Sequence, residues 1–449
     1  MTGCAARDMV TRLFTTDAMR ALFDERARIQ RMLDVEAALA AAQARAGVIS
    51  DDAAASIAAC CRAELYDTDA IGGAARNAGN LAIPLVAALT RKVGEASAAA
   101  RGYVHWGATS QDIIDTGLVL QLRDALALIE RDIARLDAAL AVQIHLHRAT
   151  VMPGRTWLQQ GLPVTLGLKL AGVLSALLRD RVRLSALRPR LLTLQLGGAT
   201  GTLASLGERG PAVETELAQA LRLAVADTPW HAHRDRLCEL AAALGMLTAT
   251  LGKLARDIAL LAQSEVGEAF EPAAPGRGGS STLPQKRNPV GASIAIAASI
   301  RVPHLVGTML AAAVQEHERG LGNWPAEWDT LPEIVLLAAG GLDAMAETIT
   351  GLDVDPARMR ANLEQSKGLI LAEAVQMALA PTLGRDVAHH IVREASARAL
   401  REARHLKDVL ADDPQVRAAL DDAGLERLFD PANYLGATNT FIDRVLAAR

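Results

Sequence analysis

The chain has 449 residues, of which 51% are apolar, 3% are aromatic and 22% are charged, and its formal net charge is -4 at pH 7. This charge excludes bulk attraction to nucleic acid or to an anionic membrane surface, so local cations must hold any anionic substrate. No apolar run is long and uncharged enough to predict a transmembrane helix, and the N-terminal residues lack the apolar core of a secretory signal, so we expect a cytoplasmic protein.

Alanine and leucine dominate the apolar residues, and both are strong helix formers. At this length a single compact domain would be unusual. We expect an all-α protein with three helical domains, over residues 1–108, 109–364 and 365–449. The first domain contains short helical patterns such as Ala27–Ala44.

A polar cluster, HWGATSQD at residues 105–112, precedes the next helical pattern. The adjacent hydroxyls of Thr109 and Ser110 are suited to binding a carboxylate at a helix N-terminus. Simple N-capping by Ser110 explains the same residues equally well. The cluster alone therefore leaves both interpretations open.

The central part of the chain carries apolar residues at alternating three- and four-residue steps, which is typical of long helices packed side by side. The clearest pattern predicts a helix over residues 236–265, roughly 45 Å long at about 1.5 Å per residue. Similar patterns cover residues 118–140 and 168–187. Together they predict a central bundle of long helices.

Two further polar clusters are GRTWLQ at residues 154–159 and QEHER at residues 315–319. Taken alone, the first fits a surface arginine at a helix start, and the second fits a solvated, charged helix end. The first cluster also places cationic and amide groups ahead of an apolar helix.

The segment 271–289, EPAAPGRGGSSTLPQKRNP, breaks the helical background because its proline and glycine content forbids a regular helix. A mobile linker is the simple interpretation. However, a long loop inside a compact domain is usually functional, and this one contains more polar chemistry than a linker requires.

The loop suits removal of a proton from a carbon beside a carboxylate, because that reaction creates a dianion that needs cations and hydrogen-bond donors. Ser280 and Ser281 follow two glycines, where backbone N–H groups can form an anion-binding nest. Lys286 supplies a positive charge and Asn288 a neutral donor.

The remaining candidate ligands do not predict a metal site. His145 with His147, and His231 with His233, have H-x-H spacing without an accompanying carboxylate or cysteine cluster. The cysteines form no C-x-x-C pair, and we expect them to be reduced and structural: Cys4, Cys60, Cys61 and Cys238. Near the C-terminus, shorter helices are expected over residues 369–380, 385–402 and 416–428.

These motifs resemble those of the fumarase and aspartase superfamily, over nearly the whole chain. GSSTLPQKRNP resembles its signature loop, Thr109–Asp112 its first motif region and Gly154–Gln159 its second. The resemblance implies a homotetramer in which the long helices form a twenty-helix core and each active site is shared between subunits. It implies no metal or organic cofactor.

The resemblance also implies roles for individual residues. Ser280 matches the catalytic serine, and Lys286 and Asn288 match its supporting groups. Thr109, Ser110, Thr156 and Gln159 match substrate-binding positions, and Arg319 falls where one branch of the superfamily places a substrate-binding arginine. The role of His105 stays open between binding the substrate and orienting the first motif region.

One residue departs from the pattern of the superfamily's lyases. Many of them carry a histidine in the second region that transfers a proton to the leaving group, and Trp157 occupies that position here. An amine or hydroxide leaves poorly without a proton donor. A carboxylate can leave unprotonated, since its conjugate acid has a pKa of about 4. Trp157 therefore favours opening or closing of a lactone.

Longer strings, including HWGATSQDIIDT and QLGGATGTLASLG, resemble the lactone-forming cycloisomerases of the same superfamily. That implies interconversion of 3-carboxy-cis,cis-muconate and 4-carboxymuconolactone in the protocatechuate branch of the β-ketoadipate pathway. Ser280 would transfer the proton, and Thr109, Ser110, Arg155 and Asn288 would hold the carboxylates of this tricarboxylate. The alternatives are a fumarate-releasing lyase, such as adenylosuccinate lyase, and a catalytically silent protein with the same fold.

Overall fold

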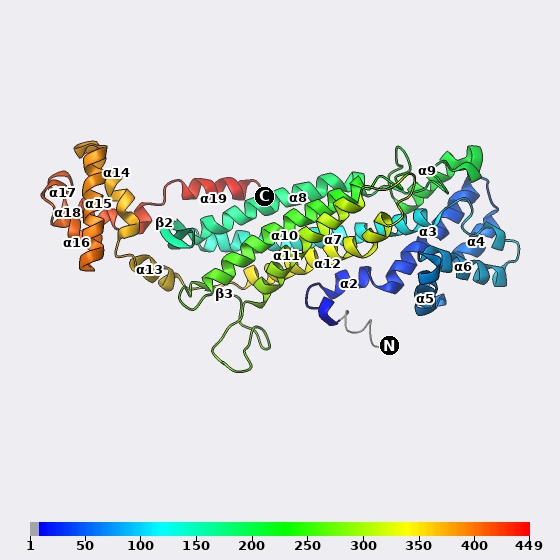
Figure 1. Ribbon diagram of the computed structural model, residues 1–449, viewed down its shortest axis with the longest axis horizontal. Helices are drawn as coiled ribbons and strands as arrows, with labels where there is room; N and C mark the ends of the chain where they lie inside the picture. Colours follow the sequence, from blue (N-terminus) through cyan, green and yellow to red (C-terminus); the bar gives the residue numbers. More distant parts are fainter. Residues whose placement is uncertain (1–8) are drawn as a thin grey trace. The chain divides into compact units, whose positions relative to one another are not determined.

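The protein, described here by a computed structural model over residues 9–449, is almost entirely helical (Figure 1). This confirms the expected all-α fold. The described residues form two antiparallel strand pairs: β1 (Val151–Thr156) with β2 (Gln159–Thr165), and β3 (Ala269–Phe270) with β4 (Asp353–Val354). Cys4 lies outside the described residues.

The N-terminal part contains short helices, several of which begin with a side-chain cap. The side chains of Thr16, Asp24, Ser50 and Asp67 each accept a backbone N–H from the first turn, which stabilises a helix start. The elements are α2 (Asp17–Leu22), α3 (Glu25–Arg45), α4 (Asp51–Ala59), η1 (Ala63–Leu65), α5 (Thr68–Ala78), α6 (Ala82–Ala96) and η2 (Arg101–Tyr103).

The long helices expected in the central part are present. They are α7 (Ser110–Leu146), α8 (Leu166–Leu191), α10 (Asp235–Leu261), α11 (Val290–Ala312) and α12 (Asn323–Thr350), with η3 (Ala204–Arg209) and α9 (Gly210–Leu221) between α8 and α10. Each apolar residue of the expected seam on α10, from Leu237 to Leu261, is at most 4% exposed. Burial of each such side chain contributes about 1.5–3 kcal/mol to the stability of the fold.

A glycine lets helices α10 and α11 approach closely. At Gly252 an added Cβ would lie 2.4 Å from Cβ of Ser299, so a larger residue would not fit there.

The C-terminal helices α14 to α18 enclose a small apolar core that includes Leu379, Val392 and Leu406. The helix expected over residues 416–428 is wrong in one respect, because the extended backbone at Leu420 divides it into two short helices. The elements are α13 (Pro356–Glu364), η4 (Leu369–Leu371), α14 (Ala372–Leu383), α15 (Arg385–Glu402), α16 (Leu406–Ala411), α17 (Pro414–Ala419), α18 (Asp422–Leu428), η5 (Pro431–Asn433) and α19 (Thr438–Ala447).

The chain divides into two compact units. The first comprises residues up to Ile133, Asp180–Gly252 and Ile294–Asp343. The second comprises Ala134–Arg179, Lys253–Ser293 and Ala344–Arg449. These units do not follow chain order, whereas the expected domains at 1–108, 109–364 and 365–449 do. That three-part division stays a prediction.

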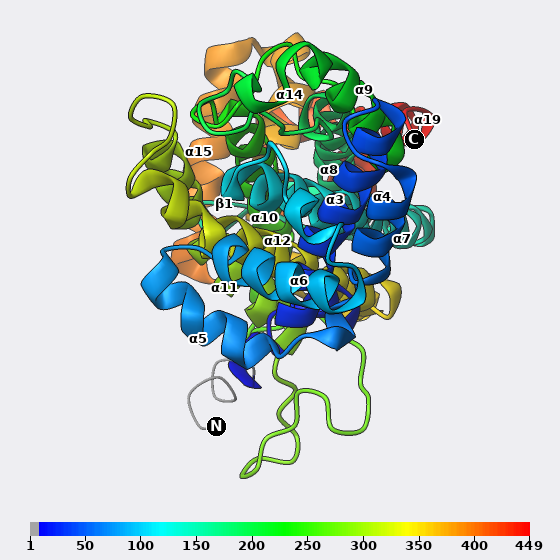
Figure 2. The same ribbon diagram turned by 90° about the vertical axis from the view of Figure 1, so that its right-hand side faces the viewer.

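The segment between β3 and α11 has no helix or strand, as expected from its sequence. In Figures 1 and 2 it extends as an open coil from the ends of these two elements. Most residues from Ser280 to Arg287 are exposed. The loop therefore presents its polar side chains to solvent in the single chain.

Candidate active site

The first motif region starts helix α7 with one half of a capping box. The helix begins at Ser110, and the backbone N–H of Thr109 donates to Oδ2 of Asp112 at 2.9 Å. A carboxylate at this position that accepts the N–H of the residue before the helix is one half of a capping box, and the other half, a bond from the Asp112 N–H to the Thr109 hydroxyl, is not formed here. The alternative interpretation, in which the Ser110 side chain caps the helix, is therefore wrong. Within residues 9–449, the hydroxyl groups of Thr109 and Ser110 form no hydrogen bond. Both hydroxyls are therefore available for a ligand.

Asp112 connects this helix start to a glycine-rich turn. It is 1% exposed, and its two oxygens accept the N–H groups of Gly197 and Gly198, each at 2.9 Å. His231 Nε2 lies 2.7 Å from Oδ1. An added Cβ on Gly197 would lie 2.9 Å from the His231 ring, so only glycine fits this approach. Asp112 thus positions the first motif region through several buried hydrogen bonds.

Arg319 lies beside the same region. Its Nε donates to Oε1 of Gln111 at 2.9 Å, and its Nη2 donates to the carbonyl of Ala199 at 3.1 Å. Gln111 is fully buried and directly follows Ser110. The structure therefore brings Arg319 to the helix start that carries the two available hydroxyls.

His105 pairs with a buried carboxylate from another helix. Its Nδ1 lies 2.6 Å from Oε1 of Glu36 on α3, whose side chain is 1% exposed. Burial lowers the pKa of His105, but the adjacent Glu36 carboxylate and, more weakly, Asp112 raise it, and the net shift is upward. His105 also has a φ of 59°, a conformation that non-glycine residues rarely adopt.

The second motif region forms a β-hairpin rather than the start of a helix. Thr156 pairs with Gln159 across a two-residue turn of Trp157 and Leu158, whose φ values are 53° and 65°. Positive φ at both positions is the geometry of a type I′ turn, which usually contains asparagine and glycine. Trp157 is 98% exposed and Leu158 is 79% exposed. The turn thus presents a large aromatic side chain to solvent in the single chain.

Arg155 forms a bidentate ion pair with Glu268, with N–O distances of 2.9 and 2.5 Å. The Glu268 side chain is fully buried and also accepts Nδ2 of Asn362 at 2.7 Å. This pairing occupies both terminal nitrogens of Arg155 and ties the hairpin to its own unit. The expected role of Arg155 in holding a substrate carboxylate stays a prediction.

The loop holds Ser280 so that its hydroxyl oxygen accepts two backbone N–H groups. The donors are Leu283 at 3.1 Å and Thr282 at 3.3 Å. Such donors stabilise negative charge on the oxygen more than they stabilise the neutral hydroxyl. The arrangement suits a serine that alternates between alcohol and alkoxide.

Lys286 and Asn288 lie on the returning side of this loop. The N–H of Asn288 donates to the carbonyl of Gly278 at 2.8 Å, and its Nδ2 donates to the carbonyl of Gly279 at 3.4 Å. An added Cβ on Gly278, where φ is 64°, would lie 2.5 Å from the Asn288 carbonyl. Asn288 therefore closes the loop around Ser280. Lys286 forms no ion pair in the part of the chain that the structure describes.

Charged groups fix the base of the loop. Both Glu271 oxygens accept N–H groups at the start of α11, from Ala292 at 2.7 Å and Gly291 at 3.0 Å. Arg277 and Arg287 bind the Glu271 carboxylate and carbonyl at 3.5 and 2.6 Å, respectively. The loop is thus anchored to the helix that follows it, while its tip is exposed.

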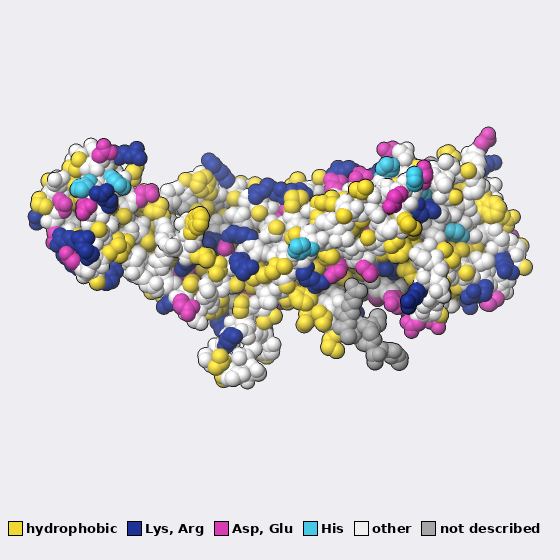
Figure 3. Space-filling view, in the orientation of Figure 1, with side chains coloured by type: hydrophobic (Ala, Val, Ile, Leu, Met, Phe, Trp, Pro, Cys, Tyr) yellow, Lys and Arg dark blue, Asp and Glu magenta, His cyan; other side chains and the backbone are white. Residues whose placement is uncertain are grey.

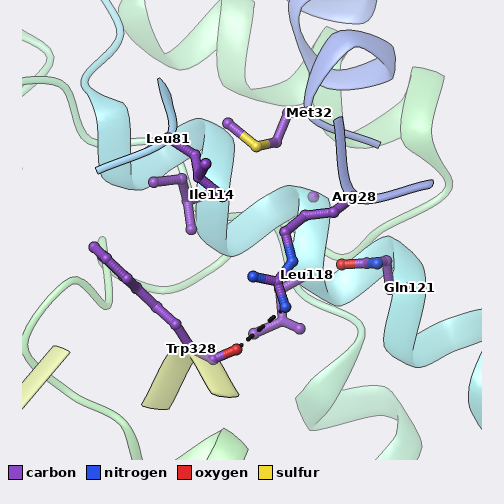
Figure 4. A pocket seen from close by; sticks show the side chains of 8 residues that line it. Arg28, Met32, Leu81, Ile114, Leu118, Gln121 and Trp328 are labelled. Carbon is purple, nitrogen blue, oxygen red and sulfur yellow. Dashed lines mark hydrogen bonds between the residues drawn. The ribbon is translucent and has the colours of Figure 1, made fainter. Parts of the chain in front are cut away.

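An apolar pocket near the first motif region is separate from the predicted site. Arg28 lies in it and donates from Nη2 to the carbonyl of Trp328 at 3.3 Å (Figure 4). Its volume is about 40 Å³, which holds a few water molecules but no tricarboxylate. None of the predicted site residues lines it; the lining residues are Arg28, Met32, Leu81, Ile114, Gly117, Leu118, Gln121 and Trp328.

Among residues 9–449, no group of three or more histidine, cysteine, aspartate or glutamate side chains is arranged to hold a metal ion. Cys60, Cys61 and Cys238 are buried free thiols. Burial raises the pKa of Cys238 to about 11 and also raises that of Cys61, so both stay protonated near neutral pH.

Sequence reasoning missed the buried acids that position these motifs. Glu36 lies in the apolar stripe of α3 between Leu33 and Leu39, and Asp112 lies inside a motif whose sequence favours the two hydroxyls as ligands. A charged residue at a core-facing position was the available signal for Glu36, since such groups require a partner. Glu268 and Glu271 gave no comparable signal, because they flank irregular segments.

The helical fold and the glycine-rich serine loop define an enzyme of the fumarase/aspartase type. Residues 12–303 match the family described as "Lyase", and residues 368–445 match the family described as "Adenylosuccinate lyase C-terminus". The chain belongs to this lyase family of the fumarase/aspartase superfamily. Enzymes of the family act on small molecules and are typically oligomeric.

Individual relatives are similar over their full length. A 3-carboxy-cis,cis-muconate cycloisomerase of Pseudomonas aeruginosa is 54% identical over 447 residues, covering 100% of this chain and 97% of that protein. The crystal structure of the 3-carboxy-cis,cis-muconate lactonizing enzyme from Pseudomonas putida has a TM-score of 0.95 and 52% identity, covering 98% of each chain. A fumarate lyase from Mesorhizobium sp. has a TM-score of 0.89 and 42% identity, covering 97% of this chain and 99% of that one.

Proposed function

We propose that the protein is a cycloisomerase that interconverts 3-carboxy-cis,cis-muconate and 4-carboxymuconolactone. Full-length similarity to enzymes with this activity supports the substrate. The structural observation that carries the mechanism is the Ser280 hydroxyl, which accepts two backbone N–H groups inside a loop that also presents Lys286.

In closure, one substrate carboxylate oxygen forms a C–O bond to the conjugated double bond. The electron pair of that double bond moves towards the carbon beside another carboxylate, and this carbon takes the proton from the Ser280 hydroxyl. The resulting alkoxide is held by the N–H groups of Thr282 and Leu283 and by the Lys286 charge. A proton from solvent then restores the serine. In lactone opening, the Ser280 alkoxide removes the same proton.

The remaining carboxylates need cations and hydroxyl donors. Thr109, Ser110 and His105 at the start of α7, with Arg319 beside them, are proposed to supply these groups, and the structure gathers all four in one unit. Thr156 and Gln159 flank the exposed hairpin turn and are proposed to contact the substrate as well. Asn288 holds the loop shape in addition to its proposed contact with a carboxylate.

Trp157 supports lactone chemistry over release of fumarate. A ring-opening step has a carboxylate as its leaving group, and this group leaves without a proton donor. A tryptophan in the second region therefore does not harm this reaction. An amine- or hydroxide-releasing lyase would need another acid at the same place.

We propose further that the enzyme is a homotetramer whose active sites combine residues from different subunits. The apolar helix α11 supports this, since only 22% of its most apolar 18-residue stretch is buried in the single chain. On this helix Ile300 is 58% exposed and Leu310 is 54% exposed. Figure 3 shows hydrophobic side chains spread over the region where Figure 1 draws α10 and α11. Monomers rarely leave such apolar surface uncovered.

Length and composition alone would also allow α10 and α11 to cross a membrane. In α10 the apolar seam is buried within the protein, as in a core helix. For α11 we favour contacts between subunits. We also propose a cytoplasmic location, because the free buried thiols suit a reducing compartment.

Light scattering of the purified protein tests assembly, with about 189 kDa expected for four chains of 47.3 kDa.

The activity test follows the ultraviolet absorbance of 3-carboxy-cis,cis-muconate with the purified protein. Loss of the conjugated-diene absorbance, with formation of the lactone by nuclear magnetic resonance, is the expected result. Absence of turnover with this substrate, together with release of fumarate from a succinyl compound, would replace the proposal by the lyase alternative. No turnover with either class would favour a catalytically silent protein.

A further inference from the structure

The pair of Glu36 and His105 has a geometry that capping and core packing do not explain. Glu36 is buried on α3, and its Oε1 lies 2.6 Å from Nδ1 of His105. Its second oxygen, Oε2, is buried without any hydrogen-bond partner. No lysine or arginine pairs with Glu36 in the described part of the chain, so the imidazole is its one partner for charge.

A buried carboxylate with a single partner is costly unless that partner carries the opposite charge. A protonated imidazole meets this need, because Nδ1 then donates to Glu36 and Nε2 carries a second N–H. The Nε2 atom has no hydrogen-bond partner within residues 9–449, and the His105 side chain is 18% exposed. One end of the ring is thus fixed by protein, and the other end is left for a ligand.

The same helix fixes the backbone around His105. Gln43 lies two turns after Glu36 on α3, therefore on the same face, and its Nε2 donates to the carbonyl of Trp106 at 2.6 Å. His105 itself adopts a φ of 59°. Surrounding structure must impose such a conformation on a non-glycine residue, and these positions concentrate at functional sites. Two buried polar side chains of α3 therefore shape the turn that leads to Thr109 and Ser110.

We propose that Glu36 is a positioning residue that keeps His105 as an imidazolium, so that its free N–H binds a substrate carboxylate together with Thr109 and Ser110. This inference rests on the proposed function and adds His105 to Arg319 as a second cation at the start of α7. It resolves the open role of His105 in favour of binding the substrate. The charged groups that surround the ring are Glu36 from α3 and Asp112 from α7.

The test compares the pH dependence of kcat/KM in wild type and in Glu36→Gln, which keeps the size and a hydrogen-bond acceptor but removes the charge. In wild type we expect kcat/KM to fall at alkaline pH as His105 loses its proton. In Glu36→Gln this fall should begin about one pH unit lower or more. The loss should appear mainly in KM, and His105→Gln should abolish the titration.

Glu327→Gln is the matched control, since Glu327 is another buried acid of the same unit, paired with Arg234 at 2.7 Å. It should lower the melting temperature without moving the alkaline fall. If Glu36→Gln also lowers only the melting temperature, the carboxylate is merely structural and the inference is overturned. If Glu36→Gln does not fold, Glu36→Asp keeps the charge at a greater distance and should shift the profile in the same direction by less.

Thermal stability gives a second readout that needs no turnover. Because the folded-state pKa of His105 is raised, the pair stabilises the fold fully below the unfolded pKa of about 6.5 and loses this effect as pH rises through the folded value. The melting-temperature difference between wild type and Glu36→Gln should therefore shrink with rising pH. A constant difference would overturn the inference even if the proposed substrate proves wrong, whereas absent wild-type turnover alone would remove only the proposed function.

Discussion

The hydroxyl oxygen of Ser280 accepts a hydrogen bond from the backbone N–H of Leu283 at 3.1 Å, within a loop closed by Asn288 and Gly278. Ser281 is adjacent but accepts no such bond from the described residues. Of these two neighbouring serines, Ser280 therefore has the backbone N–H donors that help to stabilise an alkoxide.

Replacing Ser280 by alanine should lower kcat by about 10²- to 10⁴-fold, because proton transfer by a positioned group contributes an effect of this size. The matched control is Ser281→Ala, which should stay within a few-fold of wild type. Steady-state loss of diene absorbance measures both. Equal effects of the two substitutions would show that the loop, and not the Ser280 hydroxyl, is required.

Replacing Glu271 by alanine should reduce both stability and activity. The change removes the acceptor of two N–H groups at the start of α11, at a cost of about 1–2 kcal/mol, and it frees the base of the serine loop. Asp24→Ala is the control, since it removes a helix cap on α3 by loss of the bond to Ala27 at 2.7 Å. That control should lower the melting temperature and leave kcat unchanged. Unchanged kcat in Glu271→Ala would mean that the anchor does not position the loop.

The long helices could be predicted because their apolar residues repeat with the helical period. The α10 seam is buried throughout, and the glycines and prolines of residues 271–289 predict the loop. The positioning contacts could not be predicted, since they join residues far apart in the chain. Asp112 meets Gly197, and Arg155 meets Glu268. Only the folded backbone brings such pairs together.

The second motif region shows where local patterns mislead. Trp157 and Leu158 have no turn propensity, yet they form a tight turn with positive φ at both residues. The sequence GRTWLQ therefore fits a helix start as well as a hairpin. The pairing of Met152 with Val164, which fixes the hairpin, depends on residues outside the motif.

The strained turn predicts a trade-off between stability and function. The double substitution Trp157→Asn with Leu158→Gly should raise the free energy of unfolding by about 1 kcal/mol or more, because both new residues tolerate positive φ. If Trp157 contributes to the site, the same variant should lower kcat/KM. Urea unfolding and the absorbance assay measure the two effects. A more stable variant with unchanged kcat/KM would exclude Trp157 from the site.

Lactone formation should take up one proton for each molecule closed. A carboxylate is converted to an ester while a C–H bond forms, so the product has one negative charge fewer than the substrate. A pH-stat or a weakly buffered indicator near pH 7.5 should record this uptake at the same rate as the absorbance change. In deuterated water the product should carry one deuterium beside a carboxylate. Absorbance loss without proton uptake would contradict intramolecular carboxylate addition.

A shared active site predicts that two inactive variants restore activity when they are combined. Ser280→Ala lacks the proton-transferring hydroxyl of the loop, while Thr109→Val with Ser110→Ala lacks the hydroxyls of the first motif region. If these groups come from different subunits, tetramers mixed at random in equal amounts contain about a quarter of sites with both clusters intact. Activity should therefore rise towards about a quarter of wild type after the subunits are dissociated and reassembled together. Each variant reassembled alone is the control and should stay inactive. If the mixture also stays inactive although light scattering shows mixed tetramers, the serine and the hydroxyls act within one chain.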